Sequence, residues 1–466
     1  MNFSAKIKIN NIDYDCHAKD SELVITNSDI DFWKEREKIG WSDILNEWIE
    51  ILSDDEFDID SNGRKKYLML LSYEFSGKGV LRLHIISCID LLERNDSEKS
   101  NNLIKHITIR SKVVDMFYWT DKTQIEIKEI CTSTLNSEQG CSKELKHGFE
   151  LGGKKINLYF SPVAIRKQKY LAANVFEGVD IVVVLNVECA EGLTANETLD
   201  LCNCIKAFLS FVSNSREVVL EEILININHY TKWKESLANY PNGKMFISQE
   251  TNRNDEITNI IPYSYIKENI SSIFGEIANK GIRFISLFQY DKNVISSVDV
   301  MNICATFESQ FGKTFPEVYE FDNKTFKETK EIITNIIEQL KIQPIFDCKI
   351  LSKFVRYNND SKNTGSLKFR LNYALKAFEE MDIYKNNKKL NYWEFYIKRI
   401  GGENYKEMPK RMYNARNPLS HGGIPKDRQA LTDTILLRAI VYMLILKKAD
   451  VIDENIIKCI KALFCS

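Results

Sequence analysis

The residues with the clearest chemical potential lie in one short stretch near the end of the chain, "NARNPLSHGG", residues 414–423. Arg416 stands five residues before His421, one of six histidines in the chain. An arginine is always charged and offers a planar fork to a phosphate group. A histidine with an ordinary pKa of about 6.5 can accept or donate a proton at neutral pH. The pair therefore has the residue types needed for acid–base chemistry at a phosphodiester.

The geometry of this stretch depends on Pro418. Five positions at about 100° each would leave Arg416 and His421 on different faces of an unbroken helix. A proline cannot donate an N–H and fits best in the first turn of a helix. We therefore expect a helix to restart here with Asn417 as its N-cap, which would aim both side chains at one point. The alternative is that Arg416 forms a cap or an ion pair, and that His421 ends a helix before two glycines.

An arginine and a histidine held together could cleave RNA without a metal ion. The 2′-hydroxyl of RNA would be the nucleophile, His421 the general base or acid, and Arg416 would stabilise the extra charge on the phosphorane. DNA lacks the 2′-hydroxyl, so this chemistry selects RNA. One arginine and one histidine are few for both proton transfers. A two-fold dimer, which brings the same patch of two chains together, would double the set.

Basic and aromatic residues surround the stretch. Between residues 385 and 426, ten lysines and arginines stand against three glutamates, with four tyrosines and a tryptophan interleaved. This mixture suits RNA phosphates and stacked bases. We expect Lys410 and Arg411 to contact the RNA backbone. The alternative is a solvated helical face whose aromatic residues lie in the core.

The whole chain has no comparable signal. Its 466 residues predict two or three domains, and its formal net charge of −2 requires that any nucleic acid bind through a local patch. Eleven scattered cysteines without zinc spacing predict buried free thiols in a cytoplasmic protein. The N-terminus lacks the apolar segment of a signal peptide. The longest apolar run, from Ile435 to Leu446, contains Arg438 and is too short to span a bilayer, so we expect no membrane contact. The six histidines are far apart in the sequence and no nucleotide-binding or metal-binding motif is present, so we expect no metal and no cofactor.

A weaker candidate for chemistry is "QIEIKEI", residues 124–130, which we interpret as part of a strand. Glu126 and Lys128, with Asp115 or Asp90 upstream, would fit a metal-dependent nuclease, in which carboxylates hold Mg²⁺ and the lysine positions a water molecule. The simpler interpretation is that any alternating strand with charges on its exposed face contains the same pattern, and we favour it.

The elements that would position these residues change type near residue 245. The first half alternates between apolar and polar residues, which predicts strands. His84 and His106 lie in two of them and are expected to be packed or hydrogen-bonded. Residues 76–79 are expected to form a turn between two strands. One helix interrupts the strands, and Thr194 with Glu197 fits a capping box at its start.

After a polar segment at residues 248–259, which indicates a linker, helical spacing continues almost to the end. We therefore predict an α+β chain with a β-rich domain over residues 1–247 and a helical bundle over residues 260–466. The stretch with Arg416 and His421 lies on the penultimate element of that bundle.

"RNPLSHGG" near the end of an all-helical domain, followed by "TDTILLRAIVYMLILKKA", resembles the HEPN superfamily. More specifically, it resembles the ApeA-like HEPN domain of bacterial anti-phage proteins. The hallmark of the superfamily is R-x4-6-H, often with a polar residue after the arginine, and Arg416, Asn417 and His421 match it. Glu308 in "CATFESQF" matches an acidic residue that is common in an earlier helix. In the first half, "LIKHITIRSKVVDMFYW" and "TLDLCNCIKAFLSFVSNSREVVLEEI" resemble the ApeA N-terminal domain.

The resemblance implies a metal-independent endoribonuclease that acts as a homodimer, with a composite site at the interface of its HEPN domains. Such enzymes defend bacteria against phage by cutting tRNA or other cellular RNA, which aborts the infection. By this resemblance Arg416 holds the phosphate and His421 moves protons. Asn417 orients the reacting groups, and Glu308 positions the arginine or the histidine. Pro418 is not found in every member. Some HEPN proteins are inactive, so a non-catalytic module that binds RNA or a partner is the alternative.

Overall fold

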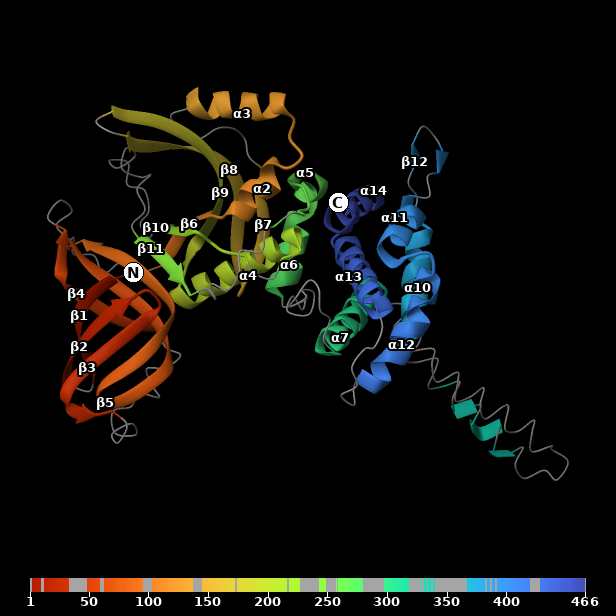
Figure 1. Ribbon diagram of the computed structural model, residues 1–466, viewed down its shortest axis with the longest axis horizontal. Helices are drawn as coiled ribbons and strands as arrows, with labels where there is room; N and C mark the ends of the chain where they lie inside the picture. The colour runs from red at the N-terminus through yellow and green to blue at the C-terminus, as the bar shows by residue number, and fades with distance from the viewer. Residues whose placement is uncertain are drawn as a thin grey trace. The chain divides into compact units, whose positions relative to one another are not determined.

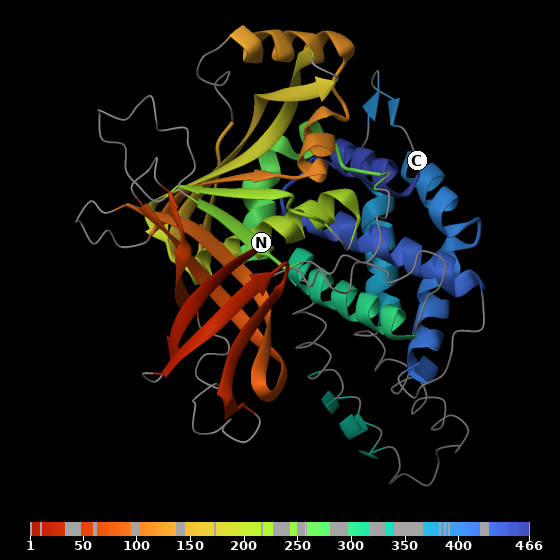
Figure 2. The same cartoon turned by 60° about the vertical axis from the view of Figure 1, so that its left-hand side comes forward.

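The computed structural model describes residues 2–9, 12–32, 48–58, 63–94, 103–136, 145–171, 174–215, 218–226, 243–248, 257, 259–279, 297–316, 318, 328, 331–332, 334–336, 338–339, 367–381, 384–385, 388–389, 392–419 and 428–465. The chain folds into two compact units and is of the mixed α+β class (Figures 1 and 2). Unit 1 comprises Met1–Leu209 and Glu217–Glu256, and unit 2 comprises Ser210–Arg216 and Ile257–Ser466. The division between Glu256 and Ile257 falls inside the polar segment at residues 248–259.

Unit 1 is built on one antiparallel sheet. Its strands follow the order β1-β2-β3-β5-β11-β10-β6-β9-β8-β7, and β4 pairs with β5 beside this path. The strands are β1 (Asn2–Ile9), β2 (Ile12–Lys19), β3 (Glu22–Asp31), β4 (Trp48–Asp58), β5 (Gly63–Arg94), β6 (Ile104–Arg110), β7 (His147–Leu151), β8 (Lys154–Leu171), β9 (Asn174–Leu193), β10 (Glu222–Asn226) and β11 (Gly243–Ile247).

The first five strands curl around a core of their own, drawn in red and orange in Figure 1. Side chains two residues apart point to the same face of a strand. Such alternation buries Tyr67, Met69 and Leu71 on one stretch of β5 and Leu81, Leu83 and Ile85 on the next. Ile9 pairs with Ile12, so β1 and β2 form a hairpin whose two turn residues lie outside the described part.

The turn expected at residues 76–79 is not formed, because β5 continues through them. Three neighbours share this strand: β4 pairs with its first part, β3 with its middle and β11 with its last part. The pairing with β3 shifts register opposite Lys78 and Val80. The glycines therefore lie at an irregularity in a long strand, a common place for glycine in a sheet.

Helix α2 (Lys112–Trp119) packs on β9, and α4 (Ala195–Ser213) contacts α2 through Phe208 and β11 through Cys202. Phe117 of α2 lies between Phe160 of β8 and Phe208 of α4, with ring centroids 5.4 and 5.6 Å away. Ile107 and Ile109 of β6 are fully covered on the same side. This aromatic and aliphatic layer is the second core of unit 1.

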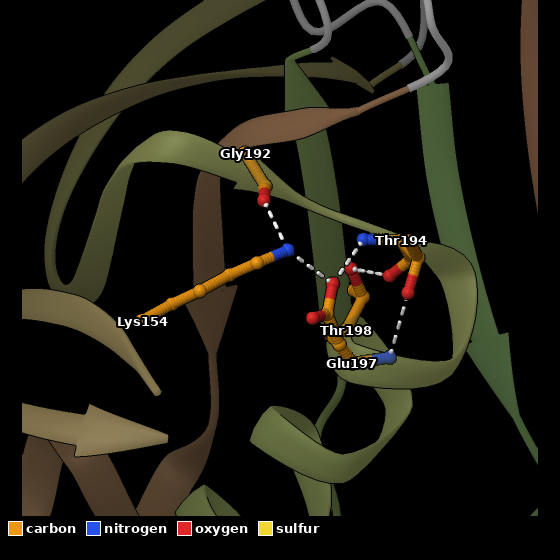
Figure 3. A network of polar contacts seen from close by, with 5 residues as sticks. All are labelled: Lys154, Gly192, Thr194, Glu197 and Thr198. Atoms are coloured by element: carbon orange, nitrogen blue, oxygen red, sulfur yellow. Dashed lines mark hydrogen bonds and ion pairs between the residues drawn. The ribbon is translucent and has the colours of Figure 1, made fainter. Parts of the chain in front are cut away.

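The start of α4 follows the predicted capping box and adds a lysine to it (Figure 3). The backbone N–H of Thr194 donates to Glu197 Oε2 at 2.8 Å, and the N–H of Glu197 lies 3.3 Å from Thr194 Oγ1. Lys154 Nζ donates to the same Glu197 oxygen at 2.7 Å and to the carbonyl of Gly192 at 2.9 Å. The box therefore also ties β8 and the end of β9 to the helix.

The segment "QIEIKEI" is helical, and the strand expected there is wrong. It opens α3 (Gln124–Asn136), which lies across the ends of β8 and β9 in Figure 1. Thr123 and Glu126 form a second capping box: Thr123 N donates to Glu126 Oε2 at 2.7 Å, and Glu126 N lies 3.3 Å from Thr123 Oγ1. The T-x-x-E signal at residues 123–126 was available in the sequence and favours a helix start over a strand.

Unit 2 is a bundle of helices. They are α5 (Tyr263–Ile266), α6 (Ile270–Ala278), α7 (Ser297–Thr314), α10 (Leu367–Glu379), α11 (Tyr392–Gly401), α12 (Met408–Leu419), α13 (Arg428–Lys448) and α14 (Asp453–Phe464). The short β12 (Tyr384–Lys385) and β13 (Lys388–Lys389) form a separate hairpin. Thr325 and Glu328 have the spacing of a further capping box, but most of the helix that this spacing predicts lies outside the described residues; the described ones within 328–339 are helical.

Helix α13 is the centre of the bundle and contacts α7, α11, α12 and α14. Every residue from Leu436 to Leu446 is buried, so this helix is covered on all sides. Tyr442 stacks on Phe211 with ring centroids 4.7 Å apart and donates a hydrogen bond to the Phe211 carbonyl at 3.0 Å. This contact explains why the last turn of α4 belongs to unit 2. Among the described helices, none has the length and apolar character needed to cross a membrane.

Candidate active site

Helix α12 carries four of the residues expected to act on RNA: Lys410, Arg411, Arg416 and Asn417. His421 lies outside the described residues. Helix α12 runs without interruption from Met408 to Leu419, so the expected restart with Asn417 as N-cap is wrong. Pro418 occupies the last turn instead. Its missing N–H deprives the Asn414 carbonyl of its usual helical partner.

Arg411 forms the best-defined ion pair of the bundle. Its Nε lies 2.7 Å from Asp433 Oδ2, and its Nη2 lies 2.7 Å from Asp433 Oδ1. Gln429 Nε2 donates to Oδ1 of the same carboxylate at 3.2 Å. The two terminal nitrogens of Arg411 also donate to the carbonyl of Asn404, at 3.2 and 3.3 Å. The Asp433 side chain is 2% exposed, so this is a buried, bidentate pair.

The pair fixes both helices that flank the segment with His421. Arg411 lies on α12, five residues before Arg416, and Asp433 lies near the start of α13. The guanidinium of Arg411 is engaged inside the bundle, whereas Lys410 is exposed. Of the two residues expected to contact RNA, Lys410 is therefore the one with an exposed side chain. Asp433 was missed in the sequence, although an aspartate inside the apolar pattern "TDTILL" was a signal for a buried partner.

Glu308 lies on α7 and is half-buried. Its Oε1 is 3.9 Å from Nη1 of Arg370 on α10, and the two side chains are 22% and 12% exposed. The pair joins α7 to α10, and α12 packs against both of these helices. Arg370 was not singled out in the sequence. It follows Leu367 by three residues and precedes Leu371, so its position beside the apolar face of α10 was the available signal.

Helices α10 and α12 run in opposite directions along each other. Near the end of α10, Glu379 Oε1 accepts a hydrogen bond from Tyr405 Oη at 2.9 Å and lies 3.5 Å from Lys406 Nζ. Tyr405 and Lys406 belong to the turn before α12, the 3₁₀ helix η3 (Tyr405–Glu407). Because the end of α10 meets the start of α12, the start of α10 lies toward the end of α12, where Arg416 is placed.

Several aromatic residues around the motif belong to the core. Trp393 and Tyr405 are buried, and Trp393 packs on Phe378 with ring centroids 5.6 Å apart. Burial, followed by the hydrogen bond to Glu379, raises the pKa of Tyr405, which keeps its hydroxyl protonated. Lys398 is paired with Glu394 at 3.3 Å and Glu403 at 3.5 Å. The alternative interpretation, a solvated face over core aromatics, therefore accounts for this part of the basic region.

The four histidines of unit 1 that the structure describes have structural surroundings. His84 Nε2 lies 3.1 Å from Ser248 Oγ, and His17 Nδ1 lies 3.0 Å from Ser4 Oγ. Burial lowers the pKa of His106, which lies on β6 opposite Glu188 of β9. His147 is buried, and its ring lies 6.3 Å from that of Phe160. The expectation that strand histidines are packed or hydrogen-bonded agrees with these positions.

The geometry of α3 does not support a metal-dependent nuclease at Glu126 and Lys128. Residues two positions apart lie about 200° apart around a helix. Glu126 caps its own helix, and the backbone and hydroxyl hydrogen bonds from Thr123 lower its pKa. Asp115 accepts a hydrogen bond from the Val183 N–H at 2.5 Å. Within the described ranges, no three His, Cys, Asp or Glu side chains gather in a way that could hold a metal ion.

Comparison of the chain with protein-family models, with curated protein sequences and with solved structures finds no match.

Proposed function

We propose that this chain is a metal-independent endoribonuclease of the HEPN type, which acts in the bacterial cytoplasm in abortive-infection defence against phage. It cleaves cellular RNA such as tRNA, as a homodimer through its helical domain, after a phage trigger. The observation that carries this proposal is the fixed frame around the R-x4-H segment. Helix α12, with Arg416, is clamped to α13 by Arg411 and Asp433, and the residues from 420 to 427, including His421, connect these two helices.

The proposed reaction starts with the 2′-hydroxyl of one nucleotide. His421 of one copy takes its proton, and the 2′-oxygen attacks the adjacent phosphorus. Arg416 holds the phosphate and stabilises the phosphorane, while Asn417 orients the groups. The bond from phosphorus to the 5′-oxygen breaks, and His421 of the second copy gives that oxygen a proton. The products are a 2′,3′-cyclic phosphate and a 5′-hydroxyl end, and neither metal nor cofactor takes part.

The test is cleavage of total bacterial RNA by the purified protein in EDTA. We would compare the wild type with His421→Ala and Arg416→Ala, and with two controls in unit 1, His17→Ala and Arg82→Ala. Arg82 is a half-exposed surface residue paired with Glu22 at 3.2 Å. The proposal predicts discrete fragments with 2′,3′-cyclic ends from the wild type and both controls, and their loss in both motif variants. The proposal is wrong if cleavage requires Mg²⁺ and survives both motif substitutions.

A non-catalytic HEPN module that binds RNA or a partner is the competing outcome. It would leave RNA intact, also in cells infected with phage, while binding RNA in a manner that depends on Lys410. Expression of the wild type and His421→Ala during phage infection separates the two. A ribonuclease protects the culture only with His421 present, whereas a binding module protects equally with either chain.

A further inference from the structure

Arg370 lies at the same end of the bundle as Arg416. The contact of Glu379 with Tyr405 and Lys406 provides a common starting point for α10 and α12. Nine residues back along α10 lead from Glu379 to Arg370, a helical rise of about 14 Å. Eleven residues forward lead from Tyr405 to Arg416, a rise of about 17 Å when the short 3₁₀ turn is included. The two positions therefore agree to within about one helical turn along helices that pack side by side.

Glu308 holds Arg370 in this place from a third helix. The contact between Glu308 Oε1 and Arg370 Nη1 is 3.9 Å, longer than the 2.7 Å contacts that Arg411 makes with Asp433. The Arg370 side chain is 12% exposed, so it is largely removed from water. A carboxylate beside a largely buried arginine offsets part of the cost of burying its charge. Helices α7 and α10 thus share a retained cation, and α12 packs against both of these helices.

We propose that Arg370 is a second phosphate-binding arginine of the site that contains Arg416, and that Glu308 is its positioning residue. The inference rests on the proposed ribonuclease function. The phosphorane carries more negative charge than the phosphodiester, and a preorganised guanidinium in a region of low dielectric stabilises it more than a solvated one would. The planar guanidinium of an arginine can also bind two phosphate oxygens at once, whereas the ammonium group of a lysine is a point charge.

The competing explanation is a structural ion pair that only fastens α7 to α10. The two explanations differ in how the partners of the pair behave. A structural pair makes Glu308 and Arg370 equivalent, because losing either one breaks the same contact. A phosphate-binding arginine makes them unequal, because Glu308→Gln keeps the guanidinium in the site whereas Arg370→Met removes it.

The experiment compares Arg370→Met, Glu308→Gln and the double variant with the wild type in metal-free cleavage, measuring kcat and KM. Lys376→Met is the matched control, because Lys376 lies on the same helix and is 76% exposed. Melting temperatures show which variants fold. We expect Arg370→Met to lower kcat by about 10²-fold, within the range found when one transition-state donor is removed. Glu308→Gln is expected to lose less than tenfold, and the double variant to follow Arg370→Met.

A second readout does not depend on turnover. RNA binding is measured over a series of KCl concentrations in a His421→Ala background. Losing one phosphate contact to a single strand should reduce the slope of log K against log salt by about 0.7. Equal losses in Arg370→Met and Glu308→Gln, or wild-type behaviour of the double variant in both readouts, would overturn the inference while the ribonuclease stands. A wild type that neither cuts nor binds RNA would remove the proposed function, and this inference with it.

Discussion

Arg411 and Asp433 form a bidentate ion pair, with two nitrogen–oxygen distances of 2.7 Å, between the helix that carries Arg416 and the central helix of the bundle. Asp433 is almost fully removed from water, and Gln429 donates a further hydrogen bond to it. A carboxylate in this position is stable only while its partners remain. The pair is therefore a structural device that sets the position of α12, and it explains why an arginine in the basic region points inward.

Removing one partner of this pair should destabilise the bundle strongly. We expect Asp433→Asn and Arg411→Met each to lower the free energy of unfolding by about 3 kcal/mol, because each leaves a charged group without its counter-ion in a buried place. The double variant Arg411→Met/Asp433→Leu should recover much of the loss. Urea denaturation followed by circular dichroism measures this. The control is Lys458→Met, which breaks an exposed pair with Glu454 and should cost below about 1 kcal/mol.

If the two single variants were as stable as the wild type, the pair would not hold α12. If the double variant were as unstable as the singles, the packing of the side chains would matter more than their charge.

The capping box of α4 should make the stability of unit 1 depend on pH. The hydrogen bond from Lys154, followed by that from the Thr194 N–H, holds the pKa of Glu197 below its ordinary value. A carboxylate with a lowered folded-state pKa stabilises the fold above its unfolded pKa of about 4.3, and this contribution is lost as pH falls through the folded pKa. Glu197→Gln should therefore cost about 1 kcal/mol at neutral pH.

The difference between wild type and Glu197→Gln should shrink as the pH is lowered below about 4. Urea midpoints measured between neutral and acidic pH follow it, with Glu150→Gln as the control, since Glu150 is exposed on β7. A difference in stability that stayed constant down to the acid transition would contradict a role for the ionised Glu197 carboxylate. The loss would then come from a contact that does not depend on pH.

Gly401, at the end of α11, should not tolerate a side chain. A Cβ there would lie 2.6 Å from Leu436 Cδ2 and 3.1 Å from Tyr405 Cβ. Leu436 is fully buried on α13, so any shift of its side chain disturbs the close packing around it. Gly401→Ala should lower the free energy of unfolding by about 1 to 3 kcal/mol through overpacking. The matched control is Gly275→Ala on α6, where nothing lies within 4 Å of the new Cβ, and which should stabilise by about 0.5 to 1 kcal/mol.

Thermal denaturation of the two glycine variants decides the matter. A Gly401→Ala chain that melted at or above the wild-type temperature would show that α11 shifts without loss of stability. The close approach of Gly401 to α13 would then not exclude a side chain at this position.

Tyr442 should contribute through both its ring and its hydroxyl. The hydroxyl donates to the Phe211 carbonyl at 3.0 Å and lies 3.3 Å from Asn214 Oδ1, in a fully buried place. Tyr442→Phe removes this donor and leaves the Phe211 carbonyl with only the longer hydrogen bond from the Asn214 N–H at 3.3 Å, which should cost about 1 to 2 kcal/mol. Tyr442→Leu also loses the stack on Phe211 and leaves a cavity, so it should cost more, about 3 kcal/mol or above. Equal losses in both variants, measured in urea, would contradict a role for the ring.

Local patterns in the sequence predicted the elements whose signals are local. Thr194 and Glu197 marked the start of α4, because a capping box is formed by neighbours three residues apart. Leu367, Leu371, Leu375 and Phe378 marked the buried face of α10 for the same reason. Where two local signals competed, as at residues 123–130, the alternating pattern was given too much weight and the capping box too little. The turn expected in β5 failed because its outcome depends on the strands that pair on either side.

The sequence by itself determined the mixed class of the fold, most of its helices, and the R-x4-H spacing that gives the bundle a possible chemistry. Only the tertiary structure decided that α12 continues through Pro418, that Arg411 turns inward to Asp433, and that Glu308 meets Arg370. The physical reason is that an ion pair between helices depends on side chains far apart in the chain being brought within about 4 Å of each other. The spacing of residues along one helix contains no information about which residue on another helix will lie opposite.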